Sequence, residues 1–422
     1  MEKTLPFTKE QLEAWRDRYP TPFYVYDEAG IRACVERVRR AFAWCPGYRE
    51  YFAVKATPTP AILRLLASLG CGCDCASETE LLMAERCGIT GDRVFFSANQ
   101  TSPREYAMAH ALGGVINLDD VCEIPKMEAG CGVPETVCCR YNPGKFAIGN
   151  DIIGTLGESK FGMPKDQLFA ALKELKEKGA RRFGVHAMLA SCSLDAAYYP
   201  LLARELFSLA LEIRETLGIT LDFIDLSGGV GIPYRPEQEP VDILAVGEAV
   251  HKVYDELMTA NGMAPALYTE MGRFITGPYG YLVASVTGEK RTYKHYVGLD
   301  ATAANLMRPA MYGAYHHIIV PGKEALPKTD RADVVGSLCE NNDKFAVDRM
   351  LPETEAGDLV VICDAGAHGH AMGYNYNGRL RSAELLLHPD GEVTLIRRAQ
   401  TVADYFATLD VDEAFAKAGQ KA

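Results

Sequence analysis

The chain has 422 residues, of which 48% are hydrophobic and 24% charged, which is typical of a globular protein with room for two domains. Its formal net charge of -12 argues against nucleic acid or an anionic membrane as a partner, because both attract basic surfaces. No apolar run has the length of a signal peptide core or a bilayer span, so we expect neither. Thirteen irregularly spaced cysteines indicate reduced thiols and a cytoplasmic protein.

Up to about Pro278, short β-rich runs alternate with amphipathic helical segments. Helical patterns such as 78–87 and 241–261 end near glycines or polar residues, as helices commonly do. Because eight strands separated by helices are typical of a closed barrel, we predict a (β/α)8 barrel over residues 30–280. The eight strands are expected at 50–54, 73–76, 94–97, 115–118, 137–141, 183–189, 223–226 and 267–270.

After Gly280 the pattern changes to strands without matching helices. Pro389-Asp390-Gly391 has the composition of a hairpin turn, and the β-rich run 23–26 can pair with either domain. We therefore predict a second, mostly β domain formed by residues 1–29 and 281–422. Its strands are expected at 281–285, 293–299, 334–338, 359–363, 383–387 and 393–397.

Lys55 closes the run Tyr51-Phe52-Ala53-Val54-Lys55, and Pro58 and Pro60 oppose continuation of the strand. This places an amine at the carboxyl end of the first barrel strand, the end at which parallel α/β folds bind ligands. Among apolar neighbours such an amine can lose its proton and attack a carbonyl, as in Schiff-base enzymes. The alternative is a strand-end lysine that reaches into water.

Two later strand ends carry groups that complement this amine. The seventh strand runs into Ser227-Gly228-Gly229, whose backbone N–H groups can approach a phosphate, and late barrel strands commonly hold phosphate. The eighth strand ends in Glu270-Met271-Gly272-Arg273. Glu270 and Arg273 can form a simple structural ion pair. Alternatively, the carboxylate holds a protonated ring nitrogen and the guanidinium holds a phosphate oxygen. Amine, glycine turn and carboxylate together meet the needs of pyridoxal phosphate.

On these motifs the chain resembles the fold-type III pyridoxal-phosphate decarboxylases from Thr21 to Arg381, and diaminopimelate decarboxylase most closely. The resemblance implies an alanine racemase-like barrel in which Lys55 binds the cofactor covalently. It also implies that Glu270 keeps the pyridine nitrogen protonated and so strengthens the ring as an electron sink. Further cofactor contacts implied by the resemblance are Ser191, Ser227, Gly228, Gly229, Gly272, Arg273 and Tyr376.

The C-terminal domain contains segments that resemble the family's substrate-binding elements. Arg308 and Tyr312 match an R-P-x-L-Y segment that grips a substrate carboxylate; the alternative is a surface arginine beside a packed tyrosine. Cys339 and Glu340 match a C-E-x-x-D segment. The resemblance implies that Cys339 donates a proton in the partner subunit's active site and that Glu340 receives the distal amine; an ordinary buried thiol is the alternative. Tyr376 is expected over cofactor and substrate.

The resemblance implies a homodimer with shared active sites, in which the β-rich domain contributes to the substrate site and the dimer interface. The expected reaction is the decarboxylation of meso-2,6-diaminopimelate to L-lysine and carbon dioxide, a step of lysine biosynthesis. A distal carboxylate explains Arg308, whereas the bare amine of ornithine does not. The alternatives are a decarboxylase of carboxynorspermidine, arginine, ornithine or a D-amino acid, a racemase, and a non-catalytic regulatory homologue.

Several positions depart from the family pattern. Met188 stands where the second histidine of H-x-H-x-G-S is expected after His186, Ser227 replaces a loop glycine, and His368 replaces a tyrosine. A thioether packs on an aromatic face but neither donates a hydrogen bond nor carries charge. These changes affect substrate identity and stereochemistry more than the cofactor. We expect no metal, because His368 and His370 could share one face of a strand but lack a third ligand tied to them by spacing.

Overall fold

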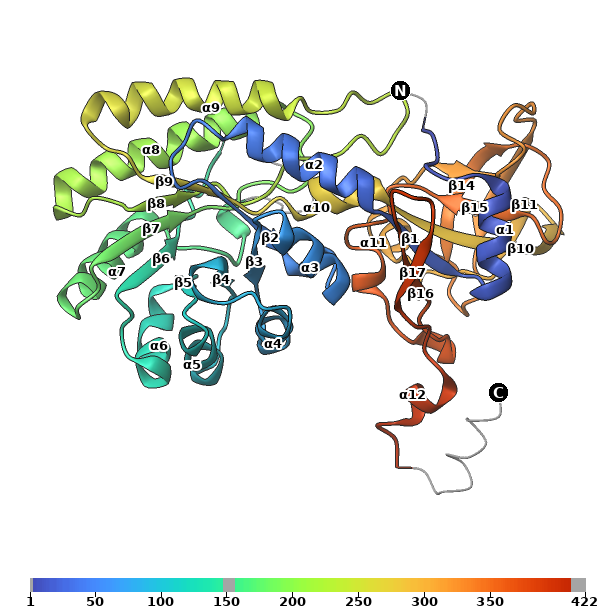
Figure 1. Ribbon diagram of the computed structural model, residues 1–422, viewed down its shortest axis with the longest axis horizontal. Coiled ribbons are helices and arrows are strands. Elements are labelled where there is room, and N and C mark those ends of the chain that lie inside the picture. Colours follow the sequence, from blue (N-terminus) through green and yellow to red (C-terminus); the bar gives the residue numbers. More distant parts are fainter. Residues whose placement is uncertain (1–2, 147–155, 411–422) are drawn as a thin grey trace. The chain divides into compact units, whose positions relative to one another are not determined.

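The computed structural model describes residues 3–146 and 156–410 (Figure 1). It divides into two compact units. The barrel unit comprises residues 32–232 and 240–275, and the β-rich unit comprises residues 1–31, 233–239 and 276–422. Within the described ranges, every helix is too short or too polar to cross a bilayer.

The barrel unit contains a closed barrel of eight parallel strands, which confirms the predicted (β/α)8 fold. Each strand pairs with the next along the chain, and the last closes on the first through Arg49–Tyr268 and Glu50–Thr269. The observed strands lie within a few residues of the expected ones. They are β2 (Arg49–Ala53), β3 (Gly72–Cys75), β4 (Val94–Ser97), β5 (Val115–Leu118), β6 (Thr136–Arg140), β7 (Arg182–His186), β8 (Phe223–Asp225) and β9 (Ala266–Thr269).

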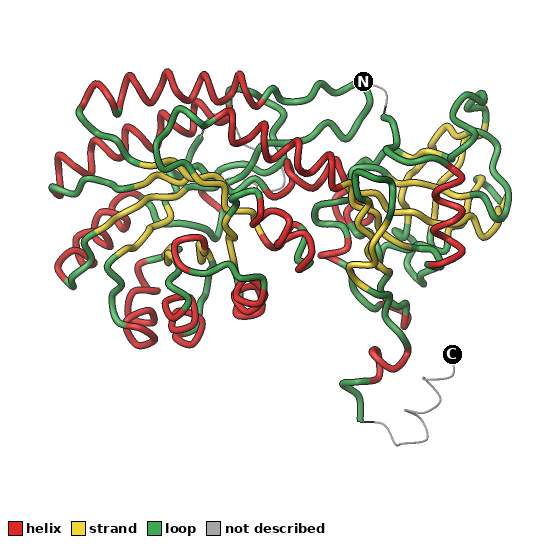
Figure 2. Tube along the Cα trace, viewed as in Figure 1, coloured by secondary structure: helices red, strands yellow, loops and turns green. Residues whose placement is uncertain are grey.

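Helices follow the strands and surround the barrel, as the red segments around the yellow strands in Figure 2 show. Their beginnings are set by local chemistry: Ser102 caps α5 and forms a capping box with Glu105, and Pro60 occupies the first turn of α3. The helices are α2 (Glu28–Ala41), α3 (Pro60–Ser68), α4 (Glu78–Arg86), α5 (Pro103–Ala111), α6 (Ile124–Cys131), α7 (Lys165–Glu177), α8 (Tyr198–Leu217), α9 (Ile243–Leu257) and α10 (Gly272–Thr276).

An aromatic layer fills the barrel interior. Tyr51, Phe223 and Tyr268 pack together with Phe95, and the rings of Phe223 and Tyr268 stack 4.7 Å apart. Because these residues come from strands on opposite sides of the barrel, they meet in its centre. Gly184 makes room for this layer, since a Cβ there would lie 2.0 Å from the Phe223 ring. The interior of the barrel is therefore a packed core and not a pore.

The β-rich unit is built on a nine-stranded sheet with the order β14-β13-β11-β10-β1-β16-β17; β15 also pairs with β10, and β12 pairs with β15. The run at 23–26 belongs to this sheet: β1 pairs antiparallel with β10 and parallel with β16. The strands are β1 (Phe23–Asp27), β10 (Gly280–Arg291), β11 (His295–Leu299), β12 (Ile318–Ile319), β13 (Asp330–Val335), β14 (Lys344–Leu351), β15 (Leu359–Ile362), β16 (Ala383–Leu387) and β17 (Val393–Arg397). The helices are α1 (Lys9–Arg18), α11 (Arg308–Tyr312) and α12 (Val402–Phe406).

Two of these strands, β12 and β14, are absent from the sequence-based expectation. The first has only two residues, and the second contains the charged residues Lys344, Asp348 and Arg349, which interrupt the apolar pattern of a strand. The core of the unit is conventional: Trp15 of α1 packs edge-on against Phe7, which in turn contacts Tyr281 of β10.

Candidate active site

Lys55 lies one short turn beyond its strand. β2 ends at Ala53, and Lys55 is the middle residue of a single 3-10 turn, Val54–Ala56, that leads toward α3. The strand therefore ends one residue earlier than expected. The Lys55 side chain is half exposed, and its Nζ atom lies 3.8 Å from Oδ2 of Asp74 in β3, so an acid lies beside the amine that we expected among apolar neighbours.

Buried carboxyl groups gather at the carboxyl ends of three strands. Asp74 in β3, Asp225 at the end of β8 and Glu270 just after β9 are each no more than 5% exposed. Burial and the nearby charge of Glu270 raise the pKa of both Asp74 and Asp225 well above the ordinary value, although Lys55 acts against this at Asp74. The sequence-based site lacked Asp74 and Asp225. Their signal is a polar residue at the end of an otherwise apolar barrel strand.

Glu270 has polar partners on two sides. Its Oε2 atom accepts a hydrogen bond of 2.7 Å from the Ser227 hydroxyl and lies 3.4 Å from Nε2 of His186, the last residue of β7. Burial opposes ionisation, but His186, Lys55 and the Ser227 hydroxyl outweigh it and lower the pKa of Glu270. Glu270 is therefore an anion inside the barrel mouth.

Several buried atoms around Glu270 make no hydrogen bond to any described residue. They are Oε1 of Glu270, both ring nitrogens of His186, Oδ1 of Asp74 and Oδ2 of Asp225. A buried polar atom without a partner costs roughly 1–3 kcal/mol. A cluster of such atoms at the ligand-binding end of a barrel indicates a polar ligand that completes them.

The segment Ser227-Gly228-Gly229 forms the expected turn after β8. A Cβ on Gly228 would lie 2.6 Å from the carbonyl oxygen of Glu270, and a Cβ on Gly229, whose φ is +104°, would lie 2.7 Å from the Tyr198 ring. The turn is fixed by backbone hydrogen bonds from Glu270 to Ser227 O and from Ser193 to Gly229 O, each 2.8 Å long. It thus links the ends of β7, β8 and β9, and a glycine turn of this kind can present successive backbone N–H groups to an anion.

Gly272 joins the segment carrying Glu270 to the turn carrying Lys55. A Cβ on Gly272 would lie 2.8 Å from the Cβ of Ala56 and 3.1 Å from that of Ala53. Arg273 follows as the second residue of α10. The structure therefore brings the predicted residues of the first and eighth strands into one cluster.

In the β-rich unit, Arg308 is buried, so the alternative of a surface arginine is wrong. It is the first residue of α11, its guanidinium lies 2.8 Å from Nε2 of His316, and its carbon atom lies 4.5 Å above the Tyr234 ring. His316 is itself held by the carbonyl oxygen of Cys363, 2.8 Å from Nδ1. The guanidinium therefore has a fixed orientation. Tyr312, four residues later on the same helix, is half exposed.

Cys339 is exposed, so the alternative of an ordinary buried thiol is wrong. Its backbone N–H donates to Oδ1 of Asn377 over 2.7 Å, which ties the Cys339 loop to the turn that contains Tyr376. Tyr376 is 48% exposed, and Glu340 is exposed beside Cys339. The predicted cysteine, acid and tyrosine are therefore grouped and accessible on the β-rich unit.

Asp343, the last residue of the C-E-x-x-D segment, supports this loop from inside. It is 2% exposed and accepts hydrogen bonds from the backbone N–H groups of Ala303 at 2.6 Å and Leu338 at 2.8 Å. Gly336 leaves space for the carboxylate, because a Cβ there would lie 2.4 Å from it. Asp343 is thus a structural residue of the loop.

His368 and His370 do not share the face of a strand. His368 has φ +53°, and His370 begins a 3-10 turn, His370–Met372, in which it is buried. The His370 ring is held by the carbonyl oxygen of Ser382 at 3.0 Å and by the guanidinium of Arg381 at 2.9 Å from Nδ1. His370 is therefore a structural residue.

Within the described ranges, one group of three potential metal ligands lies close together, namely Glu289, His295 and Asp330. The two nitrogens of His295 already have different carboxylate partners, with Nδ1 2.9 Å from Asp330 and Nε2 3.1 Å from Glu289. This arrangement is an ion-pair network between strands, and we assign no metal to it.

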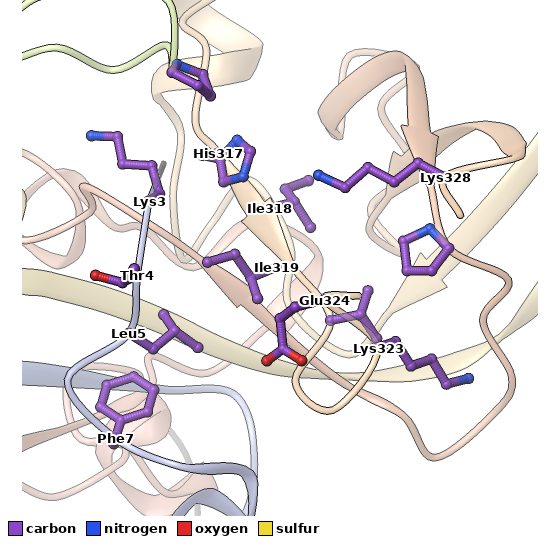
Figure 3. A pocket seen from close by; sticks show the side chains of 13 residues that line it. Lys3, Thr4, Leu5, Phe7, His317, Ile318, Ile319, Lys323, Glu324 and Lys328 are labelled. Carbon is purple, nitrogen blue, oxygen red and sulfur yellow. The ribbon is translucent and has the colours of Figure 1, made fainter. Parts of the chain in front are cut away.

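A cavity of about 560 Å³ lies in the β-rich unit (Figure 3). Apolar residues such as Leu5 and Ile319 form part of its wall, together with three lysines. Two of the lysines have acidic partners, since Lys3 lies 2.9 Å from Asp364 and Lys323 lies 2.7 Å from Asp358. None of the predicted site residues lines this cavity, and the paired charges give it no clear ligand class.

The residues at the barrel mouth fit pyridoxal phosphate. Lys55 offers an amine for its aldehyde, the unpaired Oε1 of Glu270 offers an acceptor for a protonated ring nitrogen, and the Gly228-Gly229 turn offers backbone groups for its phosphate. Asp74 and Asp225 add further polar atoms at the same end of the barrel, namely Oδ1 of Asp74 and Oδ2 of Asp225.

Comparison with known proteins agrees with this geometry. Residues 28–277 match the family model described as "Pyridoxal-dependent decarboxylase, pyridoxal binding domain". The chain is 43% identical over 396 residues to Protein TabA of Pseudomonas amygdali pv. tabaci, covering 93% of this chain and 92% of that protein. It is 34% identical over 391 residues to the diaminopimelate decarboxylase of Methanothermobacter thermautotrophicus, covering 92% and 91% of the two chains.

Comparison with solved structures points to the same family. A crystal structure of the diaminopimelate decarboxylase of M. jannaschii in complex with L-lysine superposes with a TM-score of 0.88 at 30% sequence identity. The match covers 95% of each chain, so it includes both the barrel and the β-rich unit.

Proposed function

Because the chain belongs to the pyridoxal-phosphate-dependent decarboxylases of the diaminopimelate decarboxylase family, we propose that it converts meso-2,6-diaminopimelate to L-lysine and carbon dioxide. Membership of the family establishes a decarboxylase and its cofactor but leaves the substrate open, since Protein TabA, at 43% identity, has a name that specifies none. The substrate assignment therefore depends on the side chains themselves.

The observation that carries the assignment is the fixed guanidinium of Arg308. It is buried, oriented by His316 and stacked on Tyr234, which are the conditions for bidentate recognition of a carboxylate. Diaminopimelate retains a carboxylate at the end that does not react, whereas ornithine and arginine do not. We assign Tyr312 to the same carboxylate and Glu340 to the distal amine.

In the barrel unit, Lys55 is the residue that holds the cofactor covalently, and Glu270 holds a proton on its ring nitrogen. When bound, the cofactor accepts the electron pair released as the bond between Cα and the carboxylate breaks. The anionic state of Glu270 favours this role, because an ionised carboxylate can accept the hydrogen bond from a protonated ring. We further assign Ser191, Gly228, Gly229, Gly272, Arg273 and Tyr376 to cofactor contacts.

After carbon dioxide leaves, a proton must be delivered to Cα. We assign this step to Cys339, whose exposed position allows it to act on a second copy of the chain. This assignment makes the active unit a homodimer with shared sites. A cytoplasmic location remains a prediction from the cysteine pattern.

A substrate panel on the purified holoenzyme tests the proposal. We expect lysine and carbon dioxide from meso-diaminopimelate in equal amounts, and much slower release of carbon dioxide from ornithine, lysine or arginine. Turnover of only another substrate would remove diaminopimelate as the assignment while leaving the decarboxylase family intact.

A second candidate is decarboxylation of another diamino or basic amino acid, including carboxynorspermidine or a D-amino acid. Met188 and Ser227 favour it, because both differ from the family pattern and both lie against Glu270 or its neighbour. The same panel, extended to both enantiomers of each amino acid, separates the two candidates.

A further inference from the structure

Ser227 adopts a backbone conformation that favours glycine. Its φ is +53°, and the residue is fully buried between β8 and the glycine turn. An L-residue with a side chain is strained in this region of φ, and a favourable interaction of the side chain can offset that strain.

The Ser227 hydroxyl makes that interaction with Glu270. Its Oγ atom lies 2.7 Å from Oε2 of Glu270 and 3.1 Å from Sδ of Met188. A hydroxyl has one proton, and an ionised carboxylate is a far stronger acceptor than a thioether. The Ser227 hydroxyl therefore donates its proton in a hydrogen bond to Glu270. The Met188 thioether packs beside it and does not compete for this hydrogen bond.

The backbone of Ser227 is fixed on both sides of this contact. Its N–H donates to Oδ1 of Asp225 over 2.7 Å, and its carbonyl oxygen accepts from the N–H of Glu270 over 2.8 Å and from the Tyr199 hydroxyl. Ser227 and Glu270 are thus joined through both backbone and side chain. The position of the hydroxyl, and with it the orientation of the carboxylate, is set before any ligand binds.

The consequence for Glu270 is that one oxygen is occupied and the other is available. Oε2 accepts from Ser227, whereas Oε1 is buried and makes no hydrogen bond to any described residue. The other titratable groups that act on this carboxylate from the surrounding elements are His186, Lys55, Asp74, Asp225 and Glu50. His186 and Lys55 favour the ionised form of Glu270, and the Ser227 hydroxyl adds a neutral donor that acts in the same direction.

We propose that Ser227 is a positioning residue that keeps Glu270 ionised and directs its free oxygen toward the cofactor, with Met188 as the side chain that leaves the serine proton to Glu270. The inference rests on cofactor binding by the family and not on the proposed substrate. It extends the role of this residue from the phosphate turn, where we expected it from the sequence, to the ring of the cofactor.

The test is an absorbance titration of the bound cofactor in the holoenzyme without substrate. In Ser227→Ala and Ser227→Gly, loss of the hydrogen bond to a charged group makes Glu270 easier to protonate. The midpoint of the acid-side spectral change then moves up by about one to two pH units. The glycine variant also relieves the strained φ, so it should fold at least as well as the unchanged chain.

Two further variants make the result specific. Gln100→Gly relieves another positive φ (+56°), at an exposed residue in the barrel unit, and should leave the midpoint unchanged. Met188→Leu should also leave it nearly unchanged, because the thioether does not hold the proton. An unshifted midpoint in both Ser227 variants overturns the proposal, as does a shift in Met188→Leu as large as that in Ser227→Ala. Because no substrate is added, failure of diaminopimelate turnover leaves this test unaffected.

Discussion

Gly272 packs directly on Ala56, so that a Cβ on the glycine would lie 2.8 Å from the alanine side chain. This contact joins the turn that carries Lys55 to the segment that carries Glu270, although 215 positions separate those two residues in the printed sequence. The distance between the proposed attachment point of the cofactor, Lys55, and the proposed acceptor for its ring, Glu270, thus depends on the smallest possible side chain.

Gly272→Ala is expected to weaken cofactor binding by roughly tenfold and to destabilise the fold by about 1–3 kcal/mol, because the new methyl group forces the two turns apart. Cofactor titration and urea unfolding measure the two effects. The double variant Gly272→Ala/Ala56→Gly removes the closest contact and should recover part of the affinity. Equal affinities for the unchanged and Gly272→Ala chains would contradict this role.

Lys55→Ala should abolish the visible absorbance of covalently bound cofactor and lower turnover by roughly a thousandfold or more, because no other amine replaces the attachment point. Lys55→Arg is the matched control, since it retains the charge near Asp74 but cannot form the covalent bond. A coloured Lys55→Ala protein with normal turnover would show that another lysine holds the cofactor.

Arg308→Lys is expected to raise KM for diaminopimelate by roughly 10- to 100-fold with a smaller change in kcat, because one ammonium cannot replace a bidentate guanidinium. The spectrum of the holoenzyme without substrate should not change. If KM rises equally for amino acids that lack a distal carboxylate, Arg308 acts on the fold and not on the substrate.

Mixing Lys55→Ala and Cys339→Ala chains tests whether sites are shared. If Cys339 acts across the dimer, each mixed dimer has one intact site and one with both defects, so random mixing should restore about a quarter of the activity. Each variant alone stays inactive or nearly so. Absence of any recovery, with mixed dimers demonstrated by mass, would place the two residues in the same chain's site.

Glu50→Gln should make the barrel less sensitive to alkaline pH. Burial raises the pKa of Glu50 to about 8, while hydrogen bonds from Thr269 and the backbone of Met271 act against this. An acid with a raised pKa in the folded state stabilises the fold below its unfolded value of 4.5, and this contribution is lost as pH rises toward 8. Between pH 5 and 9, ionisation of Glu50 should lower the unfolding free energy of the unchanged chain by a few kcal/mol. Glu50→Gln should lack this contribution to the fall. Parallel curves for the two chains would contradict the assignment.

The barrel was predictable because its strands are short apolar runs of the right number, and the polar residues that interrupt them mark their carboxyl ends. Lys55, Glu270 and the turn at Gly228 were found by this pattern. Asp74 and Asp225 were not assigned to the site, since a single acid at a strand end is common and only the closed barrel brings them near Glu270.

Other differences between the sequence-based predictions and the structure arise from backbone conformation. The left-handed φ of Ser227 and of His368 cannot be read from residue type, because neither serine nor histidine marks that conformation. For this reason the sequence-based interpretation assigned Ser227 only to the backbone turn expected at the phosphate, and it allowed His368 and His370 to share one face of a strand. The strand β14 was missed because its charged residues interrupt the alternation of apolar and polar residues that marks a strand.

The position of β1 also constrains the order in which the chain can fold. Phe23 pairs with Ala383 of β16 on one side and with Val283 of β10 on the other, so the N-terminal strand lacks both partners until much of the chain exists. At typical rates of synthesis this delay lasts on the order of tens of seconds. The barrel strands, whose partners follow soon after one another, can close during that interval. A nascent chain stopped before β16 would thus carry an unsatisfied apolar edge, which makes premature termination late in the gene more prone to aggregation than termination soon after the barrel.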